Sequence, residues 1–187
     1  MVKRIVIGIS GASGVIYGIK MLERLREMNI ETHLIISEFG KKNIELETTF
    51  QPSQVAALAT HCYDYRDMAA PLASGSFLTD GMVVIPCSIK TLSGIAHSYT
   101  ENLLIRAADV TLKEKRKLIL VVRETPIHLG HIRMMEAAIE CGAQILPPVP
   151  SFYHHPQTID DIIHQTIGKI FDSLGIEHDL FRRWGET

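Results

Sequence analysis

The chain has 187 residues, which is enough for one domain with a full hydrophobic core. Its formal net charge is −2, and because no block of basic residues stands out, a nucleic-acid partner is not expected. No apolar run reaches the length of a membrane span. Cys62, Cys87 and Cys141 lack C-x-x-C spacing, which argues against a disulfide framework or a zinc site and favours a reducing, cytoplasmic setting.

Continuous apolar runs, typical of buried strands, alternate along the chain with segments whose apolar residues have helical spacing. Strands are expected over residues 4–9, 32–36, 82–85, 117–122 and 143–146. The first helix places Val15 on its apolar face and stops near Asn29; further helices are expected over 38–47, 53–60, 89–98, 102–115, 128–141 and 158–174. The apolar positions of the first helix and the slightly positive hydropathy favour a homo-oligomer.

This alternation predicts an α/β fold, with one domain over residues 1–187 and a parallel sheet between two layers of helices. Ligands of such folds bind outside the carboxyl ends of the strands. Polar stretches follow strand ends, or lie in a loop beyond one, at residues 10–14, 86–91, 123–126 and 152–156. We therefore expect these stretches to meet at one edge of the sheet and to hold phosphate groups.

The first stretch contains glycines at positions 8, 11 and 14. This spacing has one residue more than the dinucleotide fingerprint, and Ser37 stands where an acidic residue would bind an adenosine ribose. Ser37 suits a flavin phosphate or ribityl chain better. The alternative is a tight turn between strand and helix, with Ser13 as the helix cap.

The second stretch places Ser88, Lys90 and Thr91 in the first turn of an expected helix. Hydroxyl groups at this point can add to the free backbone N–H groups and hold phosphate oxygens. A serine that only caps the helix remains the alternative.

Charged residues elsewhere differ in how well they are placed. Arg106 and Lys113 share one helix face with Asp109, a pattern more typical of a solvated salt-bridged face than of a site. Arg123 and Glu124 directly follow a strand end, where an arginine can bind phosphate and a glutamate can carry protons. Glu47 could be an ordinary exposed charge at a helix end.

The nine histidines do not have the spacing of a metal site. His128 and His131 lie three residues apart on one helix, and His154 and His155 are adjacent, so they point apart in an extended loop. No metal is therefore expected. Tyr153 lies in the same proline-bounded loop, where it is better placed to cover a pocket than to fill a core.

Taken together, these stretches resemble the UbiX-type flavin prenyltransferases over essentially the whole chain. The motifs that carry the resemblance are GISGASG at 8–14, ASGSF at 73–77, PCSIKTLSGI at 86–95, RAADV at 106–110, RETP at 123–126 and PPVPSFYH at 147–154. The resemblance implies a flavodoxin- or Rossmann-like fold in dodecamers. It also implies transfer of a dimethylallyl group from dimethylallyl monophosphate to N5 and C6 of reduced FMN, without a metal. The prenylated FMN would serve a UbiD-type decarboxylase, including that of ubiquinone biosynthesis.

The family's functional positions can be assigned along this sequence. The resemblance implies FMN contacts at Gly11, Ala12, Ser13, Ser37, Ser88, Ile89, Lys90, Thr91 and Arg123. It implies substrate phosphate contacts at Lys113, Tyr153 and Lys169, with Arg106 close by, and proton transfer at Glu124, supported by Ser13 and Glu47. Many relatives have arginine in place of Lys169, and some have tryptophan in place of Met68, which leaves the shape of the allyl pocket open.

Three other functions remain as alternatives. The flavin-dependent peptidyl-cysteine decarboxylases share the expected fold, but their substrate-binding asparagine is replaced here by Lys90. A direct aryl-acid decarboxylase would need an aryl-carboxylate site that the sequence does not indicate. A flavin-binding electron carrier would not need Glu124, Lys113, Tyr153 and Lys169 beside the flavin phosphate site.

Overall fold

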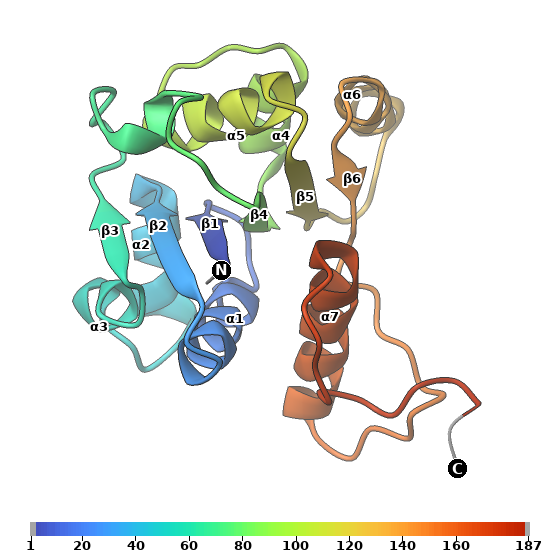
Figure 1. Ribbon diagram of the computed structural model, residues 1–187. Helices are drawn as coiled ribbons and strands as arrows, with labels where there is room; N and C mark the ends of the chain where they lie inside the picture. Colours follow the sequence, from blue (N-terminus) through green and yellow to red (C-terminus); the bar gives the residue numbers. More distant parts are fainter. Residues whose placement is uncertain (1–2, 186–187) are drawn as a thin grey trace. The chain divides into compact units, whose positions relative to one another are not determined.

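The computed structural model describes residues 3–185 (Figure 1). The chain divides into two compact units, the first ending at Pro147 and the second beginning at Pro148. The expectation of a single domain stays a prediction.

The first unit contains one parallel sheet of six strands. The strands are β1 (Arg4–Ile9), β2 (Glu31–Ile36), β3 (His61–Tyr63), β4 (Gly81–Cys87), β5 (Lys117–Val122) and β6 (Gln144–Ile145). Their order across the sheet is β3-β2-β1-β4-β5-β6, the order of Rossmann-type doubly wound folds. The winding direction of the chain reverses between β1 and β4, and the carboxyl ends of these two strands are where such folds bind ligands.

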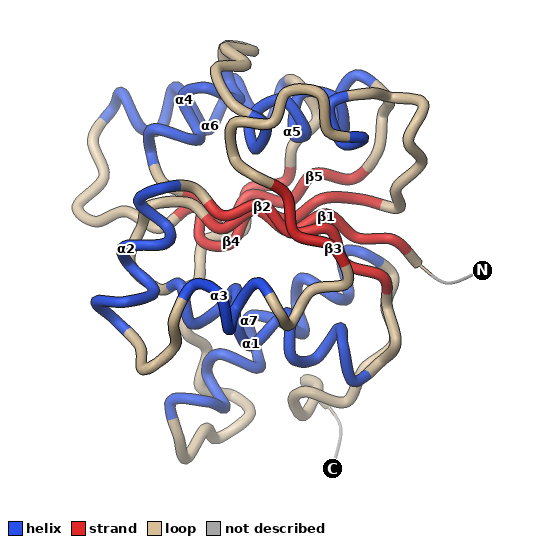
Figure 2. Tube along the Cα trace, turned by 90° about the vertical axis from the view of Figure 1, so that its left-hand side faces the viewer, coloured by secondary structure: helices blue, strands red, loops and turns tan. Residues whose placement is uncertain are grey.

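Helices cover both faces of this sheet, as the sequence predicts. The helices of the first unit are α1 (Val15–Glu27), α2 (Glu38–Glu47), α3 (Pro52–Ala56), α4 (Ile89–Ala96), α5 (Leu103–Lys113) and α6 (Leu129–Glu140). Figure 2 shows α1, α2 and α3 on one face of the sheet and α4, α5 and α6 on the other. All seven residues of β4 are buried, as expected for a central strand with helices on both sides. The three-layer prediction is confirmed.

The second unit contains α7 (Ile159–Leu174), close to the predicted helix over 158–174. Thr158 caps its first turn, since the Thr158 side chain accepts a hydrogen bond from the Asp161 N–H. Gly175 ends the helix in the left-handed conformation, with φ 66°.

The sequence prediction was wrong at two places in the first unit. The predicted helix over 53–60 ends at Ala56, because the chain turns there into the edge strand β3. This strand has only three residues, two of them exposed, so no apolar run marks it. The predicted strand over 82–85 continues to Cys87; Pro86 cannot donate a ladder hydrogen bond, and the pairing register shifts between Val84 and Cys87.

A partly buried polar network, with His33 at its centre, lies at the β3 side of the sheet. His33 is 1% exposed, its Nδ1 lies 2.8 Å from the Tyr63 hydroxyl, and its Nε2 lies 2.8 Å from Glu31 Oε1. Arg4 Nε donates to the same Glu31 oxygen at 2.8 Å. Ligand atoms of Glu31, His33 and His61 lie within 4.8 Å of one another, the spacing of a possible metal site. Both ring nitrogens of His33 already have partners, so we interpret the cluster as a hydrogen-bond network.

This network predicts a pH dependence of folding stability. Burial lowers the pKa of His33 below its ordinary value of 6.5, so the unfolded chain binds a proton before the folded chain does. The free energy of unfolding should therefore fall as the pH drops below about 6.5, by at most about 1.4 kcal/mol per pH unit. Urea titrations at several pH values should show this slope in the native protein and a flatter one in His33→Gln.

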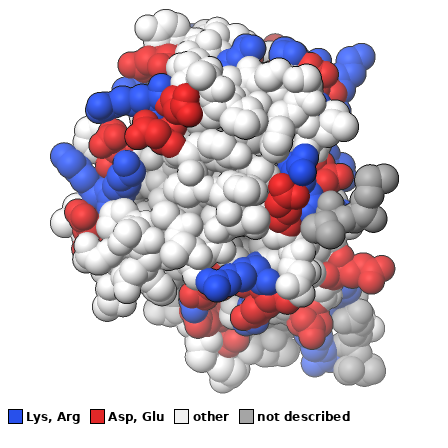
Figure 3. Space-filling model, turned by 60° about the vertical axis from the view of Figure 1, so that its left-hand side comes forward, with Lys and Arg blue, Asp and Glu red and all other residues white. Residues whose placement is uncertain are grey.

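Among residues 3–185, no helix has both the length and the apolar character needed to cross a membrane. On the face shown in Figure 3, Lys and Arg side chains alternate with Asp and Glu around a broad uncharged area.

Candidate functional site

One buried serine joins the two turns that follow β1 and β4. Ser10 is fully buried, and its hydroxyl donates to the Pro86 carbonyl at 2.9 Å. The same oxygen accepts the N–H of Ser88 at 2.8 Å. Ser10 therefore holds the first turn in a fixed position relative to the start of α4. Sequence reasoning placed this residue in a phosphate-binding stretch but gave it no role.

Replacing Ser10 with alanine should test this connection. The substitution leaves the part-buried Ser88 N–H without its acceptor and removes the donor to the buried Pro86 carbonyl, which together cost about 1–3 kcal/mol. We expect the free energy of unfolding, measured by urea titration, to fall by that amount. Ser10→Thr, which keeps the hydroxyl, should lose less if its methyl group is accommodated; a loss equal to that of alanine would indicate that packing alone matters at this position.

The amino end of α4 forms the second predicted anion-binding turn. Ser88 is the N-cap, and its side-chain oxygen accepts the Thr91 N–H at 3.3 Å. The Ser88 hydroxyl in turn donates to Thr91 Oγ1 at 3.1 Å. Capping thus holds both hydroxyls beside the free N–H groups of the first helical turn, where an anion is favoured. The two roles that the sequence left as alternatives, helix cap and anion ligand, use the same geometry.

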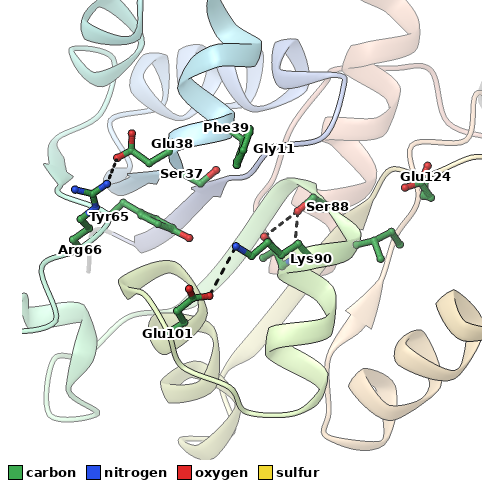
Figure 4. Close-up of a pocket in the computed structure, with 12 residues that line it drawn as sticks. Gly11, Ser37, Glu38, Phe39, Tyr65, Arg66, Ser88, Lys90, Glu101 and Glu124 are labelled. Carbon is green, nitrogen blue, oxygen red and sulfur yellow. Dashed lines mark hydrogen bonds and ion pairs between the residues drawn. The ribbon is translucent and has the colours of Figure 1, made fainter.

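A cavity of about 470 Å³ opens at this point (Figure 4). Its volume lies within the usual range of small-molecule sites. The residues that line it come from the ends of β1, β2, β4 and β5 and from two loops. They are Gly11, Ser37, Glu38, Phe39, Tyr65, Arg66, Ser88, Ile89, Lys90, Thr91, Glu101 and Glu124.

The cations of the cavity face carboxylates. Lys90 Nζ lies 4.0 Å from Glu101 Oε2, and the Lys90 side chain is 74% exposed. Across the cavity, Arg66 lies 4.0 Å from Glu38 (Figure 4). Ion pairs this long and this exposed are weak. Both cations can therefore turn to an anionic ligand at little cost.

The first predicted turn contributes to the cavity mainly through Gly11. A Cβ on Gly11 would lie 2.4 Å from Phe39 Cβ, so only glycine allows α2 to approach this closely. Gly14, in the left-handed region with φ 96°, begins α1 as its N-cap, so Ser13 is not the cap and is exposed. The Gly14 N–H donates to Glu47 Oε2 at 2.7 Å. Glu47 thus occupies the place that an anion would take at the start of α1.

The two charged residues that follow β5 lie in different environments. Glu124 lines the cavity and accepts the Thr125 N–H at 3.0 Å. Arg123 is exposed, and its backbone N–H donates to the Cys87 carbonyl at 3.1 Å. Burial raises the pKa of the Cys87 thiol, so this residue is not a nucleophile.

Four predicted substrate residues do not line this cavity. Arg106 donates to Ala73 O at 3.1 Å and to Asp109 Oδ2 at 3.0 Å, and Lys113, at the last position of α5, pairs with Glu114. Tyr153 and Lys169 belong to the second unit. Four more predicted positions are absent from the lining: Ala12, which is buried, Ser13, Glu47 and Arg123. Met68, where the sequence left the shape of the allyl pocket open, is 43% exposed and does not line this cavity either.

Sequence reasoning missed five residues of the cavity wall: Glu38, Phe39, Tyr65, Arg66 and Glu101. Glu38 and Phe39 directly follow Ser37 at the end of β2, so their position after a strand end was a usable signal. Tyr65, Arg66 and Glu101 lie in loops whose path depends on packing. For example, the Tyr65 carbonyl accepts the Leu103 N–H at 3.0 Å and so holds its loop beside α5.

Fold and site together define a doubly wound α/β protein with a cavity at its switch point whose lining suits an anionic ligand. The flavoprotein family model matches residues 1–171. The flavin prenyltransferase UbiX of Escherichia coli K12 is 57% identical over 185 residues, covering 97% of this chain and 98% of the relative. The chain therefore belongs to the UbiX flavin prenyltransferases, within the flavoprotein family.

Solved structures show the same similarity. AnUbiX (PadA1), crystallised in complex with FMN and dimethylallyl pyrophosphate, superposes with a TM-score of 0.98 at 45% identity, covering 100% of both chains. A dodecameric FMN-dependent UbiX-like decarboxylase from Escherichia coli O157:H7 gives a TM-score of 0.95 at 48% identity, covering 98% of this chain and 100% of the other. The predicted flavodoxin- or Rossmann-like fold is confirmed. The peptidyl-cysteine decarboxylase EpiD, at 18% identity, shares the fold alone.

Proposed function

We propose that this chain transfers a dimethylallyl group from dimethylallyl monophosphate to N5 and C6 of reduced FMN and releases phosphate. The observation that carries the proposal is the cavity at the switch point, where an anion-binding helix start, Lys90 and Glu124 line one wall. When bound, reduced FMN supplies the electron-rich ring that accepts the allyl group. The allylic carbon–oxygen bond breaks, and carbon bonds form at N5 and C6.

The residues of the cavity fit FMN. The first turn of α4, the hydroxyls of Ser88 and Thr91, and the ammonium group of Lys90 can bind a phosphate. Phe39 and Tyr65 offer apolar surface for a flat ring on the other side. Ser37 is 8% exposed and lines the same cavity, where the sequence predicts a contact with the flavin. In this proposal Gly11, Ala12, Ser13, Ile89 and Arg123 complete the FMN contacts.

Glu124 is proposed to move the protons of the reaction. Its carboxylate lines the cavity on the side of α4 away from Glu101 (Figure 4). A leaving phosphate needs a proton or a cation, and closing a ring at C6 requires that a proton be removed. Glu47 and Ser13 act in support. Because Glu47 accepts the Gly14 N–H, we infer that it acts by holding the first turn.

Arg106, Lys113, Tyr153 and Lys169 are proposed to bind the substrate phosphate. Arg106 and Lys113 do not line this cavity, and in this proposal they reach the substrate phosphate of a neighbouring copy. A dodecamer, the assembly implied by the family, would supply one. The prenylated FMN is proposed to pass to a UbiD-type decarboxylase, as in ubiquinone biosynthesis or aromatic acid decarboxylation, in the cytoplasm.

The proposed function is tested by mixing anaerobic, dithionite-reduced, FMN-loaded protein with dimethylallyl monophosphate and weighing the released flavin. We expect a flavin heavier by one C5H8 unit and one phosphate released per flavin. A parallel reaction with dimethylallyl pyrophosphate measures the preference between the two donors. Unmodified FMN with both donors would contradict the proposal and favour a decarboxylase or an electron carrier.

A further inference from the structure

Within the second unit, the carboxylate of Asp172 on α7 lies within 4 Å of three basic side chains. Arg183 approaches Asp172 with both terminal nitrogens: Nη2 donates to Oδ1 at 2.7 Å and Nη1 to Oδ2 at 3.1 Å. His178 Nε2 lies 3.1 Å from Oδ1. Lys169, one helical turn earlier, has its Nζ 3.8 Å from Oδ2. The Arg183 guanidinium holds the pKa of Asp172 below its ordinary range, so this carboxyl stays ionised.

The histidine of this cluster has a defined hydrogen-bonding role. The side chain of His178 is 2% exposed, and its Nδ1 accepts the Leu180 N–H at 3.2 Å. The proton of the neutral ring is therefore on Nε2, which donates to Asp172. The ring also packs against Phe171 and Phe181, with centroids 5.9 and 5.5 Å away. The C-terminal segment is thus attached to α7 at the level of Asp172.

The same segment reaches the loop that carries Tyr153. Phe181 crosses α7 at Gly168, where an added Cβ would lie 2.4 Å from the Phe181 ring. The ring of Phe181 meets that of His154 with centroids 6.4 Å apart. Trp184 meets the ring of Tyr153 edge-on, with centroids 5.6 Å apart. The segment over 176–185 therefore connects α7 with the loop that precedes α7 and carries Tyr153.

We propose that Asp172 is a positioning residue for the binding of the substrate phosphate. It acts on Lys169 directly, and on Tyr153 through Arg183 and the C-terminal segment that ends at Trp184. This inference rests on the proposed function, in which Lys169 and Tyr153 contact that phosphate.

The distances suit such a role. A lysine ammonium on four rotatable bonds loses much conformational freedom when it binds a ligand, and a nearby charge reduces that loss. At 3.8 Å, Lys169 is attracted to Asp172 without donating a tight hydrogen bond, so its N–H groups stay available for a phosphate. Arg183 takes the closer, bidentate contact and anchors the segment instead.

The test compares Asp172→Asn with Asp179→Asn. Both remove one carboxylate, but Asp179 is exposed on the same segment and lies outside the cluster. At saturating reduced FMN, we expect Asp172→Asn to raise the KM for dimethylallyl monophosphate at least fivefold. The inhibition constant of inorganic phosphate should rise in the same proportion, while the Kd of FMN stays within twofold, because the cavity residues belong to the first unit. Asp179→Asn should leave all three constants unchanged.

A second variant separates positioning from folding. Arg183→Lys keeps the charge but loses the bidentate contact. Its KM for dimethylallyl monophosphate and its inhibition constant for inorganic phosphate should therefore lie between those of the native protein and those of Arg183→Ala. It also carries the test if Asp172→Asn fails to fold. A lower kcat with unchanged KM and unchanged phosphate inhibition, in Asp172→Asn or in the Arg183 pair, would overturn the inference. Failure of the native protein to prenylate FMN would instead contradict the proposed function.

Discussion

Replacing Glu124 with glutamine is expected to lower the rate of prenylated FMN formation by about 100- to 10,000-fold, the usual contribution of a positioned general acid or base. The amide keeps the size of the side chain and can still accept the Thr125 N–H through its oxygen. It cannot donate and recover a proton at the leaving phosphate or at the ring. Single-turnover reactions with reduced FMN, followed by mass spectrometry of the flavin, measure the effect.

Glu124→Gln should bind FMN with a Kd within about twofold of the native value, because the phosphate ligands lie on α4. Glu140→Gln, at an exposed position at the end of α6, is the matched control and should keep full activity. If Glu124→Gln retained more than a tenth of the native rate, its proposed role would be wrong. If it lost FMN in proportion to activity, the residue would be part of the binding site alone.

Gly11→Ala is expected to weaken FMN binding by about tenfold or more and to lower the free energy of unfolding by about 1–3 kcal/mol. The new methyl group would lie 2.4 Å from Phe39 Cβ. That atom is fixed to the first turn of α2, so the helix and the turn must move apart. The movement changes the cavity wall, which both residues line. Flavin fluorescence titration and urea denaturation measure the two effects.

Gly8→Ala provides the comparison for Gly11→Ala. Its added Cβ would lie 3.1 Å from Leu104 Cγ, a side-chain atom that can shift by rotation. Gly8 does not line the cavity, so we expect a smaller loss of stability and an FMN Kd close to the native value. Equal losses of FMN affinity in the two variants would show that the close approach of α2 is not what shapes the site.

Much of the candidate site could be predicted from the sequence because its residues lie at the ends of strands. Ser37 and Ser88 directly follow buried strands, and Glu124 stands two residues after the end of β5; parallel strands bring their carboxyl ends to one edge. The geometry of the α4 start depends mainly on local sequence, because Ser88 as N-cap fixes the position of its own hydroxyl and of the N–H groups in the first helical turn. By contrast, the role of Ser10 depends on a contact with Pro86 and Ser88, which are more than 70 residues away in the sequence.

The loop residues of the wall could not be placed from the sequence. Tyr65 and Glu101 have no periodic pattern around them, and their positions depend on how their loops pack beside α5 and α4. The two ion pairs of the cavity could not be predicted either. The sequence spacing of Lys90 and Glu101, or of Glu38 and Arg66, gives no sign that these residues lie close together. The edge strand β3 was missed for a related reason, because it lacks an apolar run and is defined by pairing with β2.

The sequence by itself determined the class of fold, the two turns after β1 and β4, and the family. These follow from local patterns: continuous apolar strands, helical spacing, glycines and hydroxyls at helix starts, and six ordered motifs. Only the tertiary structure decided that Glu47 occupies the start of α1, that Ser10 joins the two turns, and that Asp172 gathers Lys169 and Arg183. Contacts of this kind depend on which chain segments meet in space, and a single sequence carries no local pattern for them.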